Sequence, residues 1–173
     1  MSYKSRFDPT SERAIRGLKF ESDVKESISP WIQRTLSTRA WLLESDPFLE
    51  NVQLNLLEHT WGDIAIFDLN VPYPIFIECV SLKGENSIFP NHKIKKFSGQ
   101  NKYYCFGWEN EMRFVHSFTW NSYVSKCKSL AHYKKFTRSN VMNLRNQHID
   151  AHSFCEAVLQ IENVQHNKMQ VII

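Results

Sequence analysis

Two β-rich runs joined by a short turn constrain the fold of this chain more than any other feature of its sequence. The first run extends from Trp61 to Leu69 and the second from Pro74 to Leu82, with Asn70-Val71-Pro72-Tyr73 between them. Two runs of this composition separated by turn residues predict a β-hairpin. Asp63 opens the first run and Glu78 interrupts the second, so the hairpin also carries acidic residues whose burial needs an explanation.

Helices and further strands are expected on both sides of this hairpin, in an order that predicts an α/β (α+β) fold with a mixed central β-sheet flanked by helices. Asp8-Pro9-Thr10-Ser11-Glu12 has the residues of a helix start, and Pro30 ends or kinks the helix that follows. Residues 31–45 fit a second helix or a helix followed by a strand, while 46–59 fit a helix or a strand. The other expected elements are a loop at 84–87, helices at 91–98, 120–130 and 150–161, and strands at 102–108 and 112–116.

Length and composition limit the class of protein. A chain of 173 residues with 42% hydrophobic and 23% charged residues suits a single globular domain. We expect one domain over residues 1–173, with its core at about 12–128 and a C-terminal helical part at about 129–173. No stretch approaches the roughly 20 apolar residues of a membrane span, and the first residues carry no apolar signal segment. The expected location is therefore intracellular and cytoplasmic, with the four cysteines reduced.

Basic residues are concentrated in the second half of the chain. Eight Lys and Arg residues stand against twelve Asp and Glu residues through Leu82, whereas thirteen stand against six from Lys83 onward. No acidic residue lies between Met112 and Ile149, and aromatic residues are interspersed among the basic ones there. Lys and Arg neutralise phosphates and flat rings stack on bases, so this stretch predicts contact with nucleic acid, unless it is only a solvated face. The basic residues expected to bind nucleic acid are Lys93, Lys95, Lys96, Lys126, Lys128, Lys134, Lys135 and Arg138.

Three acidic residues lie where burial is expected. Glu21 lies on the apolar stripe of the first helix, Asp63 opens an apolar strand, and Glu78 lies in the middle of another. Each alone has a structural explanation, such as a turn cap or an exposed sheet face, but a buried carboxylate is costly unless a cation pairs with it. Carboxylates that meet from a helix and adjacent strands suit Mg²⁺, which takes oxygen ligands and needs only one or two carboxylates beside a substrate phosphate. The pattern therefore points to metal-assisted phosphodiester hydrolysis, with Mg²⁺ as the expected ion and Mn²⁺ able to replace it.

The order of these residues resembles the PD-(D/E)xK nuclease superfamily, whose members share a restriction-endonuclease-like fold. The resemblance rests on Gly17-Leu18-Lys19-Phe20-Glu21, on Gly62-Asp63-Ile64-Ala65-Ile66 and on Phe76-Ile77-Glu78-Cys79-Val80, and it covers about residues 12–128. It implies a single nuclease-like domain, a divalent-metal-dependent endonuclease that hydrolyses phosphodiester bonds, with DNA as the expected substrate. In that resemblance Asp63 and Glu78 are the metal ligands, and Glu21 is the auxiliary acid of the helix.

The lysine of the superfamily motif is missing from its usual place. It normally follows the glutamate by two residues, where this chain has Val80, and Gly62 replaces the proline of the first motif. Lys83 is the nearest lysine and takes the catalytic position in this prediction. Five residues after Glu78, it has the wrong parity for a regular strand and needs a bulge or an earlier strand end. Two alternatives stay open: the site is inactive, or a lysine of the next expected helix reaches in, namely Lys93, Lys95 or Lys96.

Other interpretations lead to different classes of protein. An inactive nuclease-like domain that binds nucleic acid or a protein partner is the main alternative to an endonuclease, and a structural or regulatory α/β protein is the third. His148, His152 and Cys155 have the spacing of a partial zinc site on a helix, although surface histidines near a helix cap explain them as well. A small domain offers one active site, so an enzyme that cuts both strands of a duplex is expected to form a homodimer.

Overall fold

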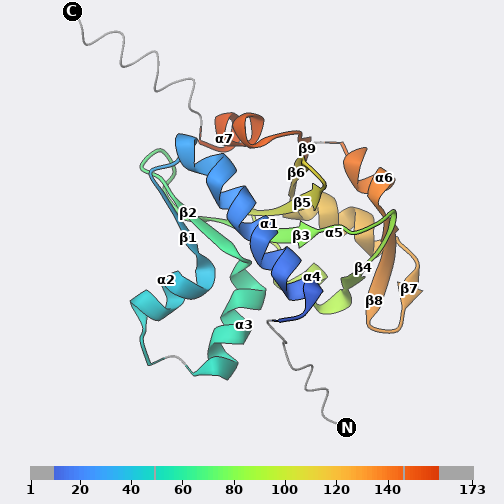
Figure 1. Ribbon diagram of the computed structural model, residues 1–173, viewed down its shortest axis with the longest axis horizontal. Helices are drawn as coiled ribbons and strands as arrows, with labels where there is room; N and C mark the ends of the chain where they lie inside the picture. Colours follow the sequence, from blue (N-terminus) through green and yellow to red (C-terminus); the bar gives the residue numbers. More distant parts are fainter. Residues whose placement is uncertain (1–9, 49, 146, 160–173) are drawn as a thin grey trace, which may run out of the picture.

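The computed structural model describes residues 10–48, 50–145 and 147–159, and its centre is a six-stranded sheet (Figure 1). The strands of this central sheet are β1 (Arg34–Ser37), β2 (Ile64–Phe67), β3 (Ile75–Ser81), β5 (Lys102–Trp108), β6 (Glu111–His116) and β9 (Gln147–His148). They lie in the order β1-β2-β3-β5-β6-β9. β3 and β5 are parallel, and the other neighbouring strands of this sheet are antiparallel.

The predicted hairpin is confirmed as the antiparallel pair β2 and β3. Ile64 is paired with Ile77, and Ile66 is paired with Ile75. The fold class is confirmed as well, because the central sheet is mixed and helices flank it. The parallel pairing of β3 with β5 requires a long connection between them, and the chain uses that connection to build a further strand and a helix.

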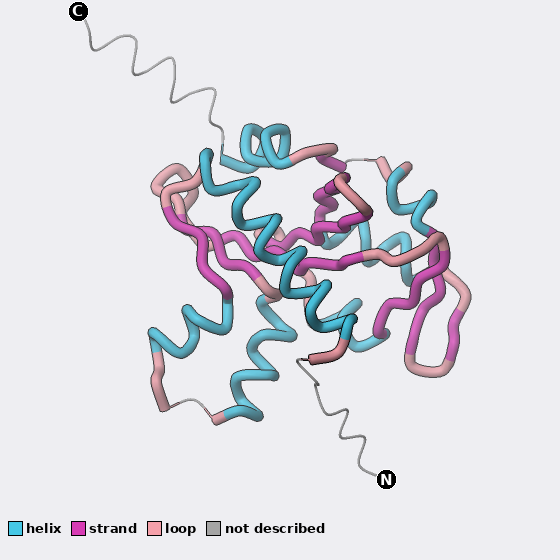
Figure 2. The backbone as a smooth tube through the Cα atoms, viewed as in Figure 1, coloured by secondary structure: helices cyan, strands magenta, loops and turns pink. Residues whose placement is uncertain are grey.

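Helices cover both faces of the central sheet (Figures 1 and 2). On one face, Val24 and Ile28 of α1 (Glu12–Ile28) join Ile64 and Ile77 in a buried cluster, which α7 (Ala151–Leu159) extends. None of the described helices is long and apolar enough to cross a bilayer. The helices that contribute to the buried cluster of the opposite face are α2 (Thr38–Ser45), α3 (Asn51–Trp61), α4 (Asn91–Lys96), α5 (Ser117–Ser125) and α6 (Arg138–Met142).

A smaller antiparallel sheet is joined to this second cluster. Its strands are β4 (Asn86–Pro90), β8 (Tyr133–Thr137) and β7 (Ser129–Leu130), in the order β4-β8-β7, and α6 (Arg138–Met142) follows β8. The rings of Phe89 and Phe136 lie 5.2 Å and 5.1 Å from the ring of Trp120. The two sheets therefore share one hydrophobic core.

The small sheet is the largest difference from the expected secondary structure. The expected loop at 84–87 enters β4, the helix expected at 120–130 ends at Ser125, and the part expected to be helical from 129 onward contains β7, β8 and β9 as well. Residues 160–173 of that part lie outside the described residues. β4 and β8 are short strands that pair across a long stretch of chain, with Ile88 opposite Lys135. Such strands depend on tertiary contacts that a local pattern does not reveal.

The two stretches with an ambiguous sequence pattern, 31–45 and 46–59, take their structure from similar tertiary contacts. Residues 31–45 form a strand before a helix, the reverse of the expected order, because β1 pairs with β2. Within 46–59, the chain enters α3 at Asn51. Pro30 lies in a 3₁₀ turn (Ser29–Trp31) that ends α1 as expected, and Ser11 caps the start of α1. Asp8 and Pro9 of the expected helix start lie outside the described residues.

Gly62 ends α3 and sets the direction of the chain at Asp63. Its φ is +79° and its ψ is −164°, a combination that residues with a Cβ rarely adopt. A Cβ at this position would lie 2.8 Å from the carbonyl oxygen of Ile77 and 2.8 Å from the ring of Phe97. The close approach of the end of α3 to β3 therefore requires glycine, and this approach places Asp63 beside β3.

We predict that Gly62→Ala lowers the free energy of unfolding by roughly 2 kcal/mol or more, because it adds backbone strain and a clash with buried atoms. Urea denaturation followed by circular dichroism measures the change. Gly17→Ala is the matched control, since Gly17 lies within α1 with open space around its Cα, and we expect it to gain about 0.5–1 kcal/mol. A Gly62→Ala protein as stable as the wild type would contradict the requirement for glycine at this turn.

Candidate active site

Asp63 is held by three hydrogen bonds, two to β3 and one to the start of α2. Its backbone amide donates to the carbonyl of Ile77 at 2.8 Å, and its own carbonyl accepts from the Thr38 amide at 2.9 Å. Its carboxylate oxygen Oδ2 accepts from the backbone amide of Cys79 at 2.8 Å. The position of the carboxylate is therefore fixed by the backbone of the neighbouring strand. Burial raises the pKa of Asp63, although the charge of Lys93 and the Cys79 amide favour its ionised form.

Glu78 is buried in the middle of β3. It is 4% exposed, and strand alternation places its side chain with Phe76 and Val80, toward the face that α3 and α4 cover. Its carboxylate forms an ion pair with the ammonium of Lys93. The cation that a carboxylate at this depth needs is thus supplied by the first helix after β4.

Lys93 interacts with both Asp63 and Glu78. Burial lowers the pKa of Lys93, and the charges of Asp63 and Glu58 oppose that shift. The ammonium therefore interacts with Asp63 as well as with its ion-pair partner Glu78. The carboxylates of Glu78 and Asp63 are therefore both within electrostatic range of one ammonium.

Two further acids approach this group from helices. Glu21 of α1 pairs with Lys25 at 3.6 Å, and burial together with the charge of Asp63 raises the pKa of Glu21. Glu58 of α3 pairs with Arg39 at 3.2 Å, and burial raises the pKa of Glu58, with a further contribution from the charge of Asp63. The structure thus places Asp63 within electrostatic range of both Lys93 and Glu21, with Glu21 on the side of the sheet that α1 covers. It adds Glu58, which lies one helical turn before Gly62 in a stretch of ambiguous sequence pattern.

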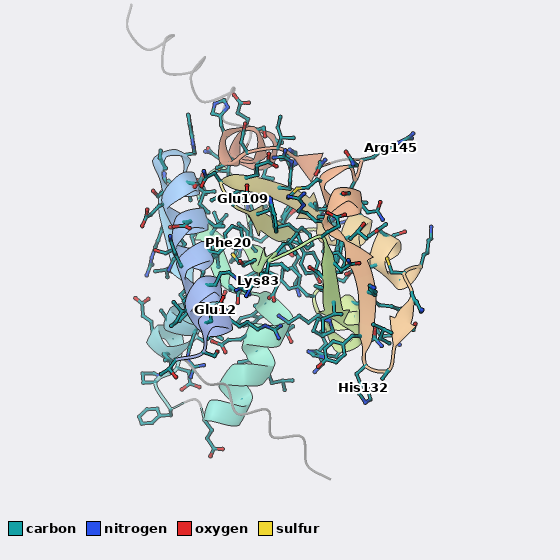
Figure 3. The ribbon with its side chains drawn as sticks, turned by 45° about the vertical axis from the view of Figure 1, so that its right-hand side comes forward. Glu12, Phe20, Lys83, Glu109, His132 and Arg145 are labelled. Atoms are coloured by element: carbon teal, nitrogen blue, oxygen red, sulfur yellow. The ribbon has the colours of Figure 1, made fainter. Side chains whose placement is uncertain are left out.

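Lys83 does not reach this cluster. Its ammonium pairs with Glu12 at 3.1 Å on the surface, where both side chains are largely exposed, and the two residues lie near each other in Figure 3. β3 ends at Ser81, so no bulge turns Lys83 toward Glu78. The placement differs from the expectation, which put Lys83 at the catalytic position, and it agrees with the alternative in which Lys93 of the following helix enters the site.

The other basic residues expected to bind nucleic acid fall into two groups. Lys134 donates to the carbonyls of Ser125 at 2.9 Å and Cys127 at 3.3 Å. Arg138 pairs with Glu85 at 3.4 Å and lies over the ring of Trp108 at 4.0 Å from its centroid. The side chains of Lys134 and Arg138 are therefore used in contacts within the fold. The second group has neither an ion pair with a described residue nor a side-chain hydrogen bond like those of Lys134, and it consists of Lys95, Lys96, Lys126, Lys128 and Lys135.

The histidines considered as zinc ligands lie away from α4, at the end of the sheet that α7 covers. His148 is in β9, next to the ring of Phe154, and His152 pairs with Glu156 at 3.2 Å. Within residues 10–48, 50–145 and 147–159, no group of three or more His, Cys, Asp or Glu side chains is arranged to hold a metal ion. Asp63 and Glu78 are the carboxylates that could hold a cation here, since Mg²⁺ needs only one or two carboxylates when a substrate phosphate supplies other oxygen donors.

Comparisons with known proteins give a structural likeness. No family model matches the chain, and no curated protein matches it. Among solved structures, it is similar to Hjc, a Holliday junction resolvase from the archaeal hyperthermophile Archaeoglobus fulgidus, with a TM-score of 0.46 and 10% sequence identity. The alignment covers 73% of this chain and 88% of that chain.

We predict that Asp63→Asn leaves the protein at least as stable as the wild type at pH 7. Asparagine keeps the oxygen that accepts from the Cys79 amide and removes a charge whose burial is unfavourable. Because burial raises the pKa of Asp63 in the folded state, the wild type loses stability as the pH rises through that pKa, and this loss is absent below the ordinary pKa. The advantage of the variant should therefore shrink as the pH is lowered from 7 toward about 4.

Thermal unfolding at several pH values measures this difference. Glu109→Gln is the control, because Glu109 is an exposed turn residue, and its melting temperature should follow the wild type at every pH. A large loss of stability in Asp63→Asn at pH 7 would show that the charge of Asp63 stabilises the fold, and the prediction would then be wrong.

Proposed function

We propose that the chain is a divalent-metal-dependent endonuclease of the PD-(D/E)xK type that hydrolyses phosphodiester bonds in DNA. The observation that carries the proposal is the proximity of three residues: Asp63 directly before β2, Glu78 in β3 and Lys93 in α4. The likeness to the resolvase is too distant to add support, so the proposal rests on the residues of the site. Mg²⁺ is the proposed ion, with Mn²⁺ as a substitute.

Asp63 and Glu78 are the residues that would hold the cation. Such an ion, when bound, polarises the phosphoryl oxygen and offsets negative charge on the phosphate. The Cys79 amide fixes the carboxylate of Asp63 before any substrate arrives, so little reorganisation is needed at the moment of reaction. Glu21 and Glu58 add negative charge around these ligands, which favours a divalent cation over a monovalent one.

Lys93 takes the role that the superfamily motif gives to its lysine. The motif position is occupied by Val80, and the ammonium comes instead from α4, where Glu78 holds it. An ammonium in this position donates hydrogen bonds to a phosphate at the site and stabilises the negative charge that develops during hydrolysis. The site is therefore proposed to be active in spite of the missing motif lysine.

We predict that Lys93→Arg reduces cleavage of plasmid DNA by about 10²–10³-fold, the loss typical of a displaced group that stabilises transition-state charge. Arginine keeps a positive charge beside Glu78, which avoids leaving that buried carboxylate without a partner. Lys83→Arg is the matched control and should cleave at the wild-type rate, because Lys83 pairs with Glu12 on the surface. Gel electrophoresis in Mg²⁺ or Mn²⁺ measures the rates, and circular dichroism confirms that both variants are folded.

Removal of the metal ion provides the second arm of this experiment. Cleavage should stop in EDTA and return when Mg²⁺ is added in excess. Cleavage that continues in EDTA, or a Lys83→Arg protein that fails while Lys93→Arg retains full activity, would overturn the assignment. Absence of cleavage by the wild type in both metals would favour the inactive nucleic-acid-binding domain instead. Cleavage of both strands of a duplex would then call for two copies of the chain, which sedimentation of the protein with DNA can count.

A further inference from the structure

The small sheet has an outer face whose apolar side chains are close to half exposed. Strand alternation and the pairing of β4 with β8 and of β7 with β8 place seven residues on this face: Asn86, Ile88, Pro90, Leu130, Tyr133, Lys135 and Thr137. We use the term outer face for four exposed members of this set: Ile88, Leu130, Tyr133 and Lys135. Ile88 is 49% exposed, Leu130 41% and Tyr133 42%, and Lys135 is exposed as well. Apolar and aromatic side chains gathered in this way on one small sheet are typical of a binding surface.

The side chains on the inner face of the same sheet are engaged in contacts with the rest of the fold. Phe89 and Phe136 are each 2% exposed and pack against Trp120. Lys134, which alternates to this side, donates to the end of α5 through the carbonyl of Ser125. The small sheet is therefore firmly held from below, and the side chains of its outer face are presented on a fixed support.

The surroundings of the outer face are positively charged. β7 and β8 lie in the stretch from 113 to 148, which contains no Asp or Glu, and Glu85, the acid next to β4, is paired with Arg138. Lys126, Lys128 and Lys135 form no ion pair with any described residue, and Lys126 and Lys135 are exposed. An exposed tyrosine ring beside unpaired lysines is complementary to a polyanion that also offers flat apolar surfaces.

The hairpin of β7 and β8 is fastened to the helix that carries Lys93. The amide of Asn91 donates to the carbonyl of His132 at 2.9 Å, and its side-chain nitrogen Nδ2 donates to the carbonyl of Ala131 at 3.2 Å. Asn91 begins α4, and Lys93 follows it by two residues, about 3 Å along the helix axis. The tip of the hairpin, marked by His132 in Figure 3, therefore lies next to the start of the helix that enters the candidate active site.

We propose that the outer face binds unpaired nucleotides of the nucleic-acid strand that enters the active site. Tyr133 stacks on a base, Ile88 and Leu130 pack against its sugar and base edge, and Lys135 contacts phosphate. Paired bases are stacked on one another within a duplex and do not offer their faces to a protein surface, whereas single strands do. The position of this surface beside the active site rests on the proposed function, but binding itself requires neither metal nor cleavage.

The test measures the affinity of the full chain in EDTA for a fluorescein-labelled thymidine 12-mer and for a labelled duplex of the same length, by fluorescence anisotropy. We expect Tyr133→Ala to weaken binding of the single strand about tenfold, the effect of one lost stacking contact, and to change duplex binding by less than about twofold. Lys135→Ala should weaken binding of the single strand and make it less dependent on salt. Tyr73→Ala and Lys19→Ala are the matched controls, because both residues are exposed elsewhere on the surface, and they should bind like the wild type.

The results that would contradict this proposal differ from those that would contradict the proposed function. Unchanged binding of the single strand by a folded Tyr133→Ala protein, or an equal loss for single strand and duplex, would overturn the proposal. A wild type that does not bind the 12-mer at low salt would overturn it too. Selective loss with Tyr133→Ala in a protein that cleaves nothing would support this surface while contradicting the nuclease assignment, so the two proposals are judged separately.

Discussion

The ion pair between Glu78 and Lys93 is the interaction on which the candidate site depends. Glu78 lies deep in β3 with its side chain among apolar residues, and an isolated carboxylate in that place would be strongly unfavourable. α4 supplies the ammonium because the long connection between the parallel strands β3 and β5 returns the chain past Glu78. The fold thereby supplies in space the lysine that the local motif lacks at Val80.

The other acids are brought to this pair by different structural means. Gly62 allows the chain to turn out of α3 where α3 approaches β3 closely. The carboxylate of Asp63 then accepts a hydrogen bond from the amide of Cys79. Glu21 arrives from α1, which lies across the opposite face of the sheet (Figure 1). Burial raises the pKa values of Glu21, Glu58 and Asp63, and the charge of Asp63 adds to the rise for Glu21 and Glu58. Groups perturbed in this way are common at functional sites.

The sequence was sufficient for the parts of the fold that follow local rules. The hairpin and the strands of β5 and β6 have strong apolar patterns between turn residues, and Asp63 and Glu78 stood out because they interrupt such patterns. Lys93 could be offered only as an alternative, since its role depends on how α4 packs. Glu58 was missed because its helix has no clear periodicity, and the small sheet was missed because β4 and β8 gain their stability from pairing with each other far along the chain.

A double-mutant cycle between Glu78 and Lys93 tests the meeting of these two residues most directly. The free energy of unfolding would be measured by urea denaturation for Glu78→Gln, Lys93→Met and the double variant. We predict a coupling free energy of at least about 1 kcal/mol, as found for contacting groups in one network, and a clearly smaller coupling for the exposed pair of Glu12 and Lys83 measured in the same way. Additive effects of the two buried substitutions would contradict the contact between Glu78 and Lys93, and with it the site.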